Sequence, residues 1–250
     1  MGSEMCIRDR FNTAVAFRLG VPFLGSDSWC PLCDQILTRT GEHATCCCAG
    51  GDVNVRHNSL RDQVYFKCRA AGLEAEREEP GLLPDDPRRR PGNVYVPSVP
   101  DRGPCALDLA VTCPMQQDMV SGAAQAKLSA ATAYEAKKFA DRDTAARCAA
   151  QGVRLVPLVA ETLGGWGPEA QGFFKVLAAK LAETTSVDPS VATAQLYETL
   201  GVHLQRHNAS ALLTRLAASR TASLNSAALA ANLSSEAALL ASEAVMMADA

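Results

Sequence analysis

The sequence contains few aromatic residues and no long apolar run. Aromatic residues make up 5% of the 250 positions, and isolated aromatic side chains do not form a base-stacking surface for nucleic acid. No apolar stretch reaches the length of about 18 residues that a membrane-spanning helix needs, so we expect no membrane partner. The first ten residues lack the basic start and apolar core of a secretory signal peptide. The sequence therefore argues against a membrane protein and against a secreted one.

Net positive charge is also absent. The chain has 24 Lys and Arg residues against 27 Asp and Glu residues, which gives a net charge of −3. The protein as a whole therefore has no electrostatic field that would attract nucleic acid, and any such contact must come from local clusters. Arg88, Arg89 and Arg90 form one such cluster in a charged, proline-rich loop, and we predict that they contact phosphate.

Cysteine, by contrast, is abundant, with ten residues. Half of them gather with His43 between positions 30 and 48, and the others are scattered along the chain. In a chain without a secretory signal, this distribution favours one metal site in a reducing compartment over a disulfide framework. We therefore expect an intracellular protein, in the nucleus or the cytosol.

The cysteine cluster has the spacing of a CCHC zinc site. Cys30 and Cys33 are separated by two residues, His43 follows after nine more, and another cysteine comes four or five positions later. Zinc prefers four such ligands in a tetrahedron, and four protein ligands leave no position for a reactive water. We predict a structural zinc module over residues 28–52, with Cys48 as the favoured fourth ligand and Cys47 as the alternative.

The remaining chain has the pattern of an α/β domain with a mixed central sheet flanked by helices. Helices are predicted over 56–72, across 118–150, from Pro168 onward and over 190–217, and strands over 94–96, 105–112 and 153–159. We divide the chain into a leader at 1–27, the zinc module, a main domain at 53–217, and an Ala-rich, low-complexity tail at 218–250.

Several short motifs together carry a family resemblance. They are Cys30-Pro-Leu-Cys33 with His43, Arg56-His57-Asn58, Arg90-Pro91-x-Asn93, Ala106-Leu107-Asp108, and Tyr134-Glu135-x-x-Lys138. In their order and spacing they resemble the C-terminal region of non-LTR retrotransposon reverse transcriptase polyproteins, over residues 11–217. In that family a CCHC zinc motif precedes a restriction-like endonuclease of the PD-(D/E)XK type. The resemblance implies a restriction-endonuclease-like fold and Mg²⁺-dependent nicking of target DNA. It also implies DNA, or the RNA of the element, as a partner, and an upstream reverse transcriptase domain in intact relatives.

The resemblance assigns catalytic roles to four residues, which are Asn93, Asp108, Glu135 and Lys138. Enzymes of this fold cleave a phosphodiester with carboxylates that hold Mg²⁺ and a lysine that orients the attacking water. The family's first metal-binding aspartate belongs at position 93, where this chain has asparagine. An amide oxygen is a much weaker ligand for a hard dication than a carboxylate. We therefore predict weak or no cleavage. Arg56 and His57, which open the first core helix, are candidate nucleic-acid-binding residues.

Each candidate also has an ordinary structural interpretation. Asp108 interrupts an apolar strand, where hydrogen bonds from the backbone would stabilise it as well as a metal would. Glu135 and Lys138 have the spacing of an i,i+3 surface ion pair, and Lys137 is an alternative to Lys138. Two other functions fit the sequence. One is a non-catalytic nucleic-acid-binding module that uses the zinc segment and the arginine loop, and the other is an expressed remnant of a retroelement.

Overall fold

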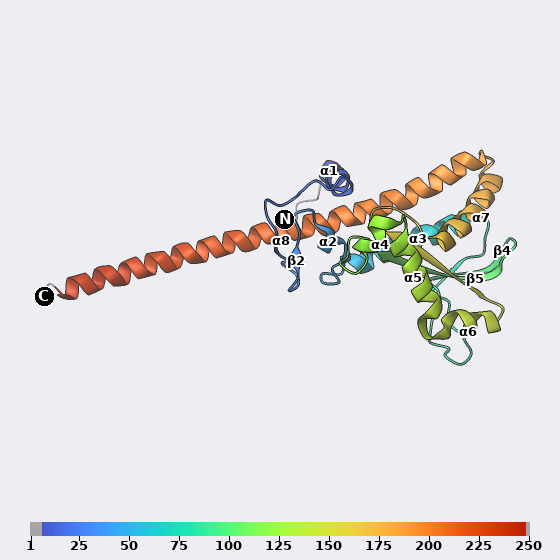
Figure 1. Ribbon diagram of the computed structural model, residues 1–250, viewed down its shortest axis with the longest axis horizontal. Coiled ribbons are helices and arrows are strands. Elements are labelled where there is room, and N and C mark those ends of the chain that lie inside the picture. The colour runs from blue at the N-terminus through green and yellow to red at the C-terminus, as the bar shows by residue number, and fades with distance from the viewer. Residues whose placement is uncertain (1–6, 249–250) are drawn as a thin grey trace.

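A mixed four-stranded sheet lies at the centre of the computed structural model, which describes the backbone of residues 7–248 and the side chains of residues 7–218. The strand order is β3-β4-β5-β6, with β4 antiparallel to β3 and to β5, and β6 parallel to β5. The strands are β3 (Glu76–Arg77), β4 (Val94–Val99), β5 (Gly103–Thr112) and β6 (Arg154–Glu161). Helices flank the sheet, so the predicted mixed α/β class is confirmed (Figure 1).

Strand β6 is almost entirely apolar because both of its faces are covered. Val156 and Leu158 point into the main core, whereas Val159 packs against Ala131 on the opposite face. Side chains alternate between the faces in the neighbouring β5 as well. Asp108 therefore lies on the same face as Ala110, which belongs to the Val159 cluster.

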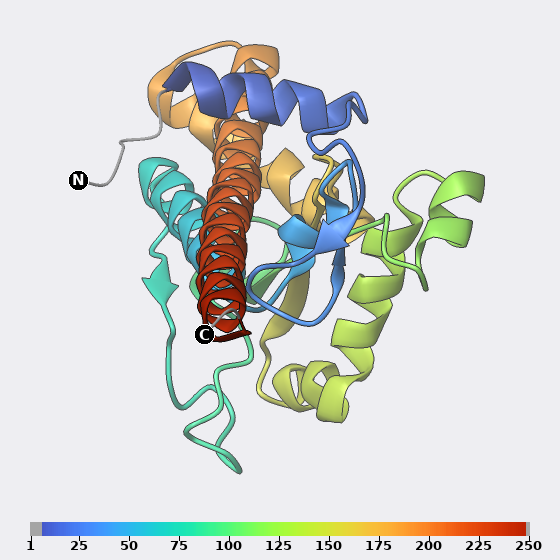
Figure 2. The same ribbon diagram turned by 90° about the vertical axis from the view of Figure 1, so that its left-hand side faces the viewer.

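The main core is formed by α3 (Asp52–Ala70), α7 (Pro168–Thr185) and α8 (Pro189–Ala248), which cover one face of the sheet. The opposite face is covered by α5 (Ser129–Ala140) and α6 (Thr144–Ala150), with α4 (Val120–Gln125) beside them. Figure 2 shows the two groups of helices on opposite sides of the molecule. Helix α7 begins at Pro168, as predicted, because proline is favoured in the first turn, where its missing N–H is not needed.

The segment 118–150 is not the single helical stretch that its alanine content predicts. Arg142 and Asp143 have φ angles of 48° and 52°, and a short 3₁₀ turn, η1 (Asp141–Asp143), separates α5 from α6. Residues other than glycine rarely adopt this conformation, so the local sequence gives no signal for the break. The break turns α6 back toward the start of β6 and leaves η1 beside the arginine loop.

The predicted zinc module packs mainly against α8. It consists of the β1–β2 hairpin (Ser28–Trp29 and Ile36–Leu37) and α2 (Glu42–Cys46), and the preceding α1 (Ile7–Arg18) crosses the same part of α8 (Figures 1 and 2). Phe17 of α1, Leu37, Ala44 and Leu212 form one buried cluster. The module and the main domain are thus joined mainly through α8, with further contacts from Thr45 of α2 to Arg56 of α3 and to Cys113 after β5.

Helix α8 continues well past the predicted end at 217 and projects from the body of the protein (Figure 1). The side chains of residues 219–250, which make up nearly all of the predicted low-complexity tail, lie outside the described part of the structure.

Among the described residues, no helix is both long enough and apolar enough to cross a membrane.

Candidate functional site

Four side chains of the module bring their donor atoms together. Cys30 and Cys33 lie in the β1–β2 turn, which is closed by the hydrogen bond from the Cys30 N–H to Gln35 O at 2.8 Å. His43 comes from α2, and Cys47 follows the end of that helix. The Cys33 sulfur lies 3.1 Å from His43 Nε2 and 3.6 Å from the Cys47 sulfur. All four donor atoms lie within 4.8 Å of one another.

This donor set fits a zinc ion. In a tetrahedral site with Zn–S bonds of about 2.3 Å, two sulfurs lie roughly 3.8 Å apart, which is close to the Cys33–Cys47 separation. Burial raises the pKa of Cys33 to about 11, so this thiol stays protonated unless a metal displaces the proton. The cluster could therefore hold a metal ion compatible with zinc. With four protein ligands, such an ion would stabilise the fold and would not activate water.

The fourth member of the cluster is Cys47, so the favoured choice of Cys48 is wrong. Cys48 is exposed, and its sulfur lies 3.8 Å from the carbonyl oxygen of Cys46. The reason is local, because α2 ends at Cys46 and the backbone at Cys47 is extended, with φ −65° and ψ 119°. Successive side chains of an extended backbone point in opposite directions, so Cys47 faces inward and Cys48 faces solvent.

In the main domain, the structure brings Asp108 of β5 and Lys138 of α5 together. The Lys138 ammonium lies 2.8 Å from the Asp108 carboxylate, and their side chains are 27% and 17% exposed. Burial raises the pKa of Asp108 above its ordinary value, and this outweighs the opposing effects of Lys138 and of His57. The carboxylate is thus poorly solvated and depends on a nearby positive charge.

Asn93 lies beside this pair, directly before β4. Its N–H donates to Leu107 O at 2.7 Å, and its side-chain oxygen accepts from Leu109 N–H at 2.8 Å, so its bonds flank Asp108 on both sides. His57 of α3 donates from Nε2 to Leu109 O at 3.2 Å. Strand β4 pairs with β5 only as far as Leu107. Beyond that point, the side chains of Asn93 and His57 form hydrogen bonds with the backbone N–H and C=O of Leu109 in place of a neighbouring strand.

Glu135 does not belong to this group. It is buried, and its carboxylate accepts from the Glu169 N–H at 3.2 and 3.4 Å in the first turn of α7. Such a carboxylate satisfies backbone donors that a helix N-terminus otherwise leaves free. The structure therefore corrects the catalytic interpretation, because Glu135 joins α5 to α7. The structure also excludes a surface ion pair between Glu135 and Lys138, because Glu135 is buried and Lys138 pairs with Asp108.

Arg56 is also a structural residue. It is 3% exposed, and its Nη1 donates to Thr45 O and to Asn208 Oδ1, both at 2.7 Å. A guanidinium buried in this way cannot contact nucleic acid, so that prediction is wrong. A basic residue at the start of a helix gives no sign of whether it points to solvent or into the protein, so sequence reasoning could not decide this point.

A polar cleft of about 150 Å³ opens over Asp108 and Lys138. Arg89 and Arg90 line it, and Arg89 is held there by a 3.0 Å ion pair with Asp141 and by a hydrogen bond to Thr144. Arg88 is exposed and is not among the lining residues. The cleft therefore combines two carboxylates, those of Asp108 and Asp141, with three cationic side chains, and this excess of positive charge suits a phosphate group.

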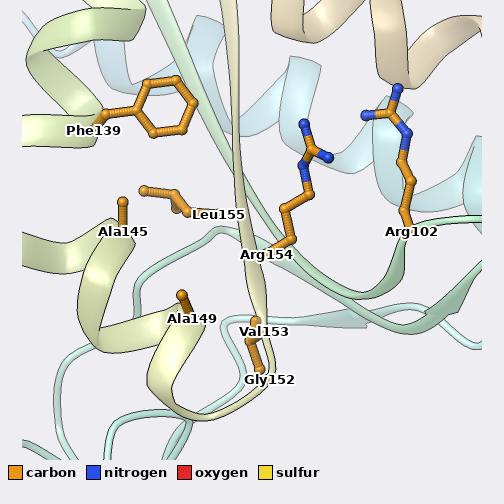
Figure 3. A pocket seen from close by; sticks show the side chains of 8 residues that line it. All are labelled: Arg102, Phe139, Ala145, Ala149, Gly152, Val153, Arg154 and Leu155. Atoms are coloured by element: carbon orange, nitrogen blue, oxygen red, sulfur yellow. The ribbon is translucent and has the colours of Figure 1, made fainter.

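A larger pocket of about 370 Å³, shown in Figure 3, adjoins this cleft through Leu155, which lines both. Arg102 and Arg154 extend to the same side of it, opposite the apolar wall formed by Phe139 (Figure 3). Arg102 donates to Gly172 O at 2.8 Å, and Arg154 pairs with Glu169 at 3.3 Å. Sequence reasoning did not find these arginines, because they are distant in the chain and only the pairing of β5 with β6 brings them together.

No protein-family model matches this chain. A search of the curated proteins finds no match either.

Proposed function

We propose that this chain is a retrotransposon-derived, restriction-like DNA endonuclease region with a zinc module and a weakened catalytic site. The observation that supports this proposal is the meeting of Asp108 and Lys138 at a polar cleft, next to position 93. A strand carboxylate and a helix lysine are the pair that the family resemblance requires at this place. In an intact relative, the region would act in the nucleus beside a reverse transcriptase domain.

The residues in the cleft suggest how the site would bind a DNA backbone. The forked guanidinium groups of Arg89 and Arg90 would bind phosphate oxygens, and Arg89 is already oriented by Asp141. The Lys138 ammonium would stabilise charge on the scissile phosphate or orient a water molecule beside it. Asp108 holds that ammonium in the cleft.

The donor set at the cleft fits Mg²⁺ poorly. The cleft holds two carboxylates, and both are already paired, Asp108 with Lys138 and Asp141 with Arg89. The oxygen of Asn93 accepts from Leu109 N–H, and as the oxygen of a neutral amide it is a weak ligand for a hard dication. Since Mg²⁺ is held through carboxylates and gives up its water reluctantly, we expect the chain to bind DNA and to cleave it slowly or not at all.

Two measurements on the purified chain test the proposal. Binding of duplex DNA is followed by fluorescence anisotropy over a range of salt concentrations, and nicking is followed on supercoiled plasmid with Mg²⁺ or Mn²⁺. We expect binding that weakens steeply with salt, because phosphate contacts release counterions. A double variant, Arg89→Ala with Arg90→Ala, should bind more weakly, whereas Lys175→Ala, which changes an exposed lysine on α7, should bind as the wild type does.

The outcomes separate the functional alternatives. Binding without nicking supports a weakened endonuclease site or a binding module, and restoring the carboxylate at position 93 then distinguishes the two. Robust nicking that Asp108→Ala abolishes would show that the site is active and not weakened. A chain that binds no DNA at low salt would refute a nucleic-acid function altogether.

A further inference from the structure

Arg215 of α8 is fully buried, yet it belongs neither to the cleft nor to the predicted metal ligands. Its Nη1 donates to Asp52 Oδ2 at 2.8 Å and to Ala211 O at 2.9 Å, and its Nη2 donates to Ala49 O at 3.0 Å. A charged side chain is buried this completely only when it is paired, and breaking such pairing is strongly destabilising. Arg215 therefore has a specific structural role at this position.

The residues around Arg215 indicate what that role is. The charge of the guanidinium also acts on the thiol of Cys47 and on the imidazole of His43. Ala49 and Asp52, which it holds, belong to the segment that leads from Cys47 into α3. One side chain of α8 thus reaches two of the four clustered donors and the backbone that follows them.

The charges at the cluster are complementary. A zinc ion with three thiolates and a neutral imidazole carries a net charge of −1, which is costly to bury without a cation. Arg215 supplies the cation from the protein interior. Asp52, whose side chain is 22% exposed, neutralises the guanidinium on its solvent side.

The module is attached to α8 at three points. Leu212 packs in the apolar cluster of the module, and Arg56 connects Thr45 of α2 to Asn208 of α8. Arg215 holds the segment that follows α2, beyond Cys47. The last turn of α2 and the segment after it, which carries Cys47, are therefore fixed to the same helix.

We propose that Arg215 is a positioning residue for the metal site, which fixes Cys47 and the loop after it and balances the charge of the bound ion. The inference rests on the zinc site that is part of the proposed function. It makes α8 part of the metal centre, although the ligands lie more than 160 residues earlier in the chain. Removing partners that orient metal ligands lowers metal affinity by about 10–100-fold in known sites.

The experiment is a zinc titration of the metal-free full chain in competition with a chromogenic chelator. Arg215→Gln should bind zinc about 10–100-fold more weakly than the wild type. Arg215→Lys keeps the charge but cannot bridge Cys47 and Ala49, so its affinity should lie between the two. With Co²⁺ in place of zinc, the visible absorption of Arg215→Gln should also change, because the geometry around Cys47 is altered.

Two controls separate this role from general destabilisation. Leu200→Ala removes a fully buried side chain from the same helix at a distance from the module, and Arg206→Gln removes an exposed arginine. Neither should change zinc affinity. If Arg215→Gln fails to fold, Asp52→Asn tests the same arrangement, because it removes the anchor of the guanidinium and should also weaken zinc binding.

The results distinguish the inference from the proposal beneath it. A wild-type chain that takes up no zinc refutes the zinc site itself. A wild type that binds zinc, together with an Arg215→Gln or, failing that, an Asp52→Asn variant whose affinity changes by less than about threefold, refutes the role of Arg215 alone. An equal loss in Leu200→Ala would also refute it, since general stability would then account for the effect.

Discussion

Restoring a carboxylate at position 93 is the sharpest test of the weakened-site hypothesis. In Asn93→Asp the side-chain NH₂ group becomes an oxygen, while the other oxygen can still accept from Leu109 N–H, as it does now at 2.8 Å. The variant therefore keeps the bond that ends the β4–β5 pairing. It adds a carboxylate directly beside Asp108, and two adjacent carboxylates hold Mg²⁺ more strongly than one carboxylate and an amide.

The expected gain follows from the energy that a bound ion provides. A metal that stabilises the charge of a phosphoryl transition state contributes several kcal/mol. Because Lys138 already neutralises part of the Asp108 charge, we take the lower end of that range, about 3 kcal/mol. Each 1.36 kcal/mol corresponds to a tenfold change in rate, so we expect nicking to rise by about a hundredfold.

The assay is single-turnover nicking of supercoiled plasmid at saturating Mg²⁺, with thermal melting as a second measurement. Two close carboxylates repel each other without a metal, so Mg²⁺ should raise the melting temperature of Asn93→Asp and leave the wild type unchanged. Asn93→Ala and the double variant Asn93→Asp with Asp108→Ala are the controls, and both should stay inactive. The reasoning is refuted if Asn93→Asp binds Mg²⁺ in the melting assay and still nicks no faster than the wild type.

Three further predictions concern single residues. Asp108→Asn should raise the melting temperature at neutral pH, because the raised pKa of Asp108 means that its ionisation destabilises the fold. This gain should be complete above the raised pKa and disappear below about pH 4, and melts at a series of pH values check it; a gain that is equal at every pH would contradict the explanation. Glu135→Ala should lower the free energy of unfolding by about 1–2 kcal/mol, because Glu169 N–H loses its acceptor, and urea unfolding measures the loss. Lower DNA nicking or binding at unchanged stability would restore the catalytic interpretation of Glu135. Cys47→Ser should lose bound zinc and Cys48→Ser should keep it, as metal analysis of the purified chains will show; the opposite result would make Cys48 the ligand.

Local patterns were sufficient for most of the regular elements. The apolar run that ends at Thr112 predicted β5, and the proline after Gly167 predicted the start of α7. The strand over 94–96 was predicted to stop at Pro97, yet β4 continues to Val99. The register of β4 with β5 shifts between Val96 and Val99, and such an irregularity accommodates a proline that cannot donate to the ladder.

Contacts between distant segments could not be predicted. Glu135 meets Glu169 across 34 residues, and Arg215 meets Asp52 across 163, and no short motif announces either contact. The identity of the fourth cysteine in the cluster could not be predicted either. The spacings from His43 to Cys47 and to Cys48 both fit zinc, and only the backbone direction after α2 decides between them. The residues around Asp108 could be proposed only through the family resemblance.

The two anchors of α5 limit how the cleft can respond to a substrate. Glu135 fixes this helix to the first turn of α7, and Lys138, one turn later, reaches β5. The backbone beneath the ammonium is therefore held, whereas the four-carbon stem of Lys138 has several rotatable bonds. Such rotations take picoseconds to nanoseconds in exposed side chains. If a phosphate binds in the cleft as proposed, the ammonium can turn from Asp108 toward it by side-chain rotation, without any displacement of α5.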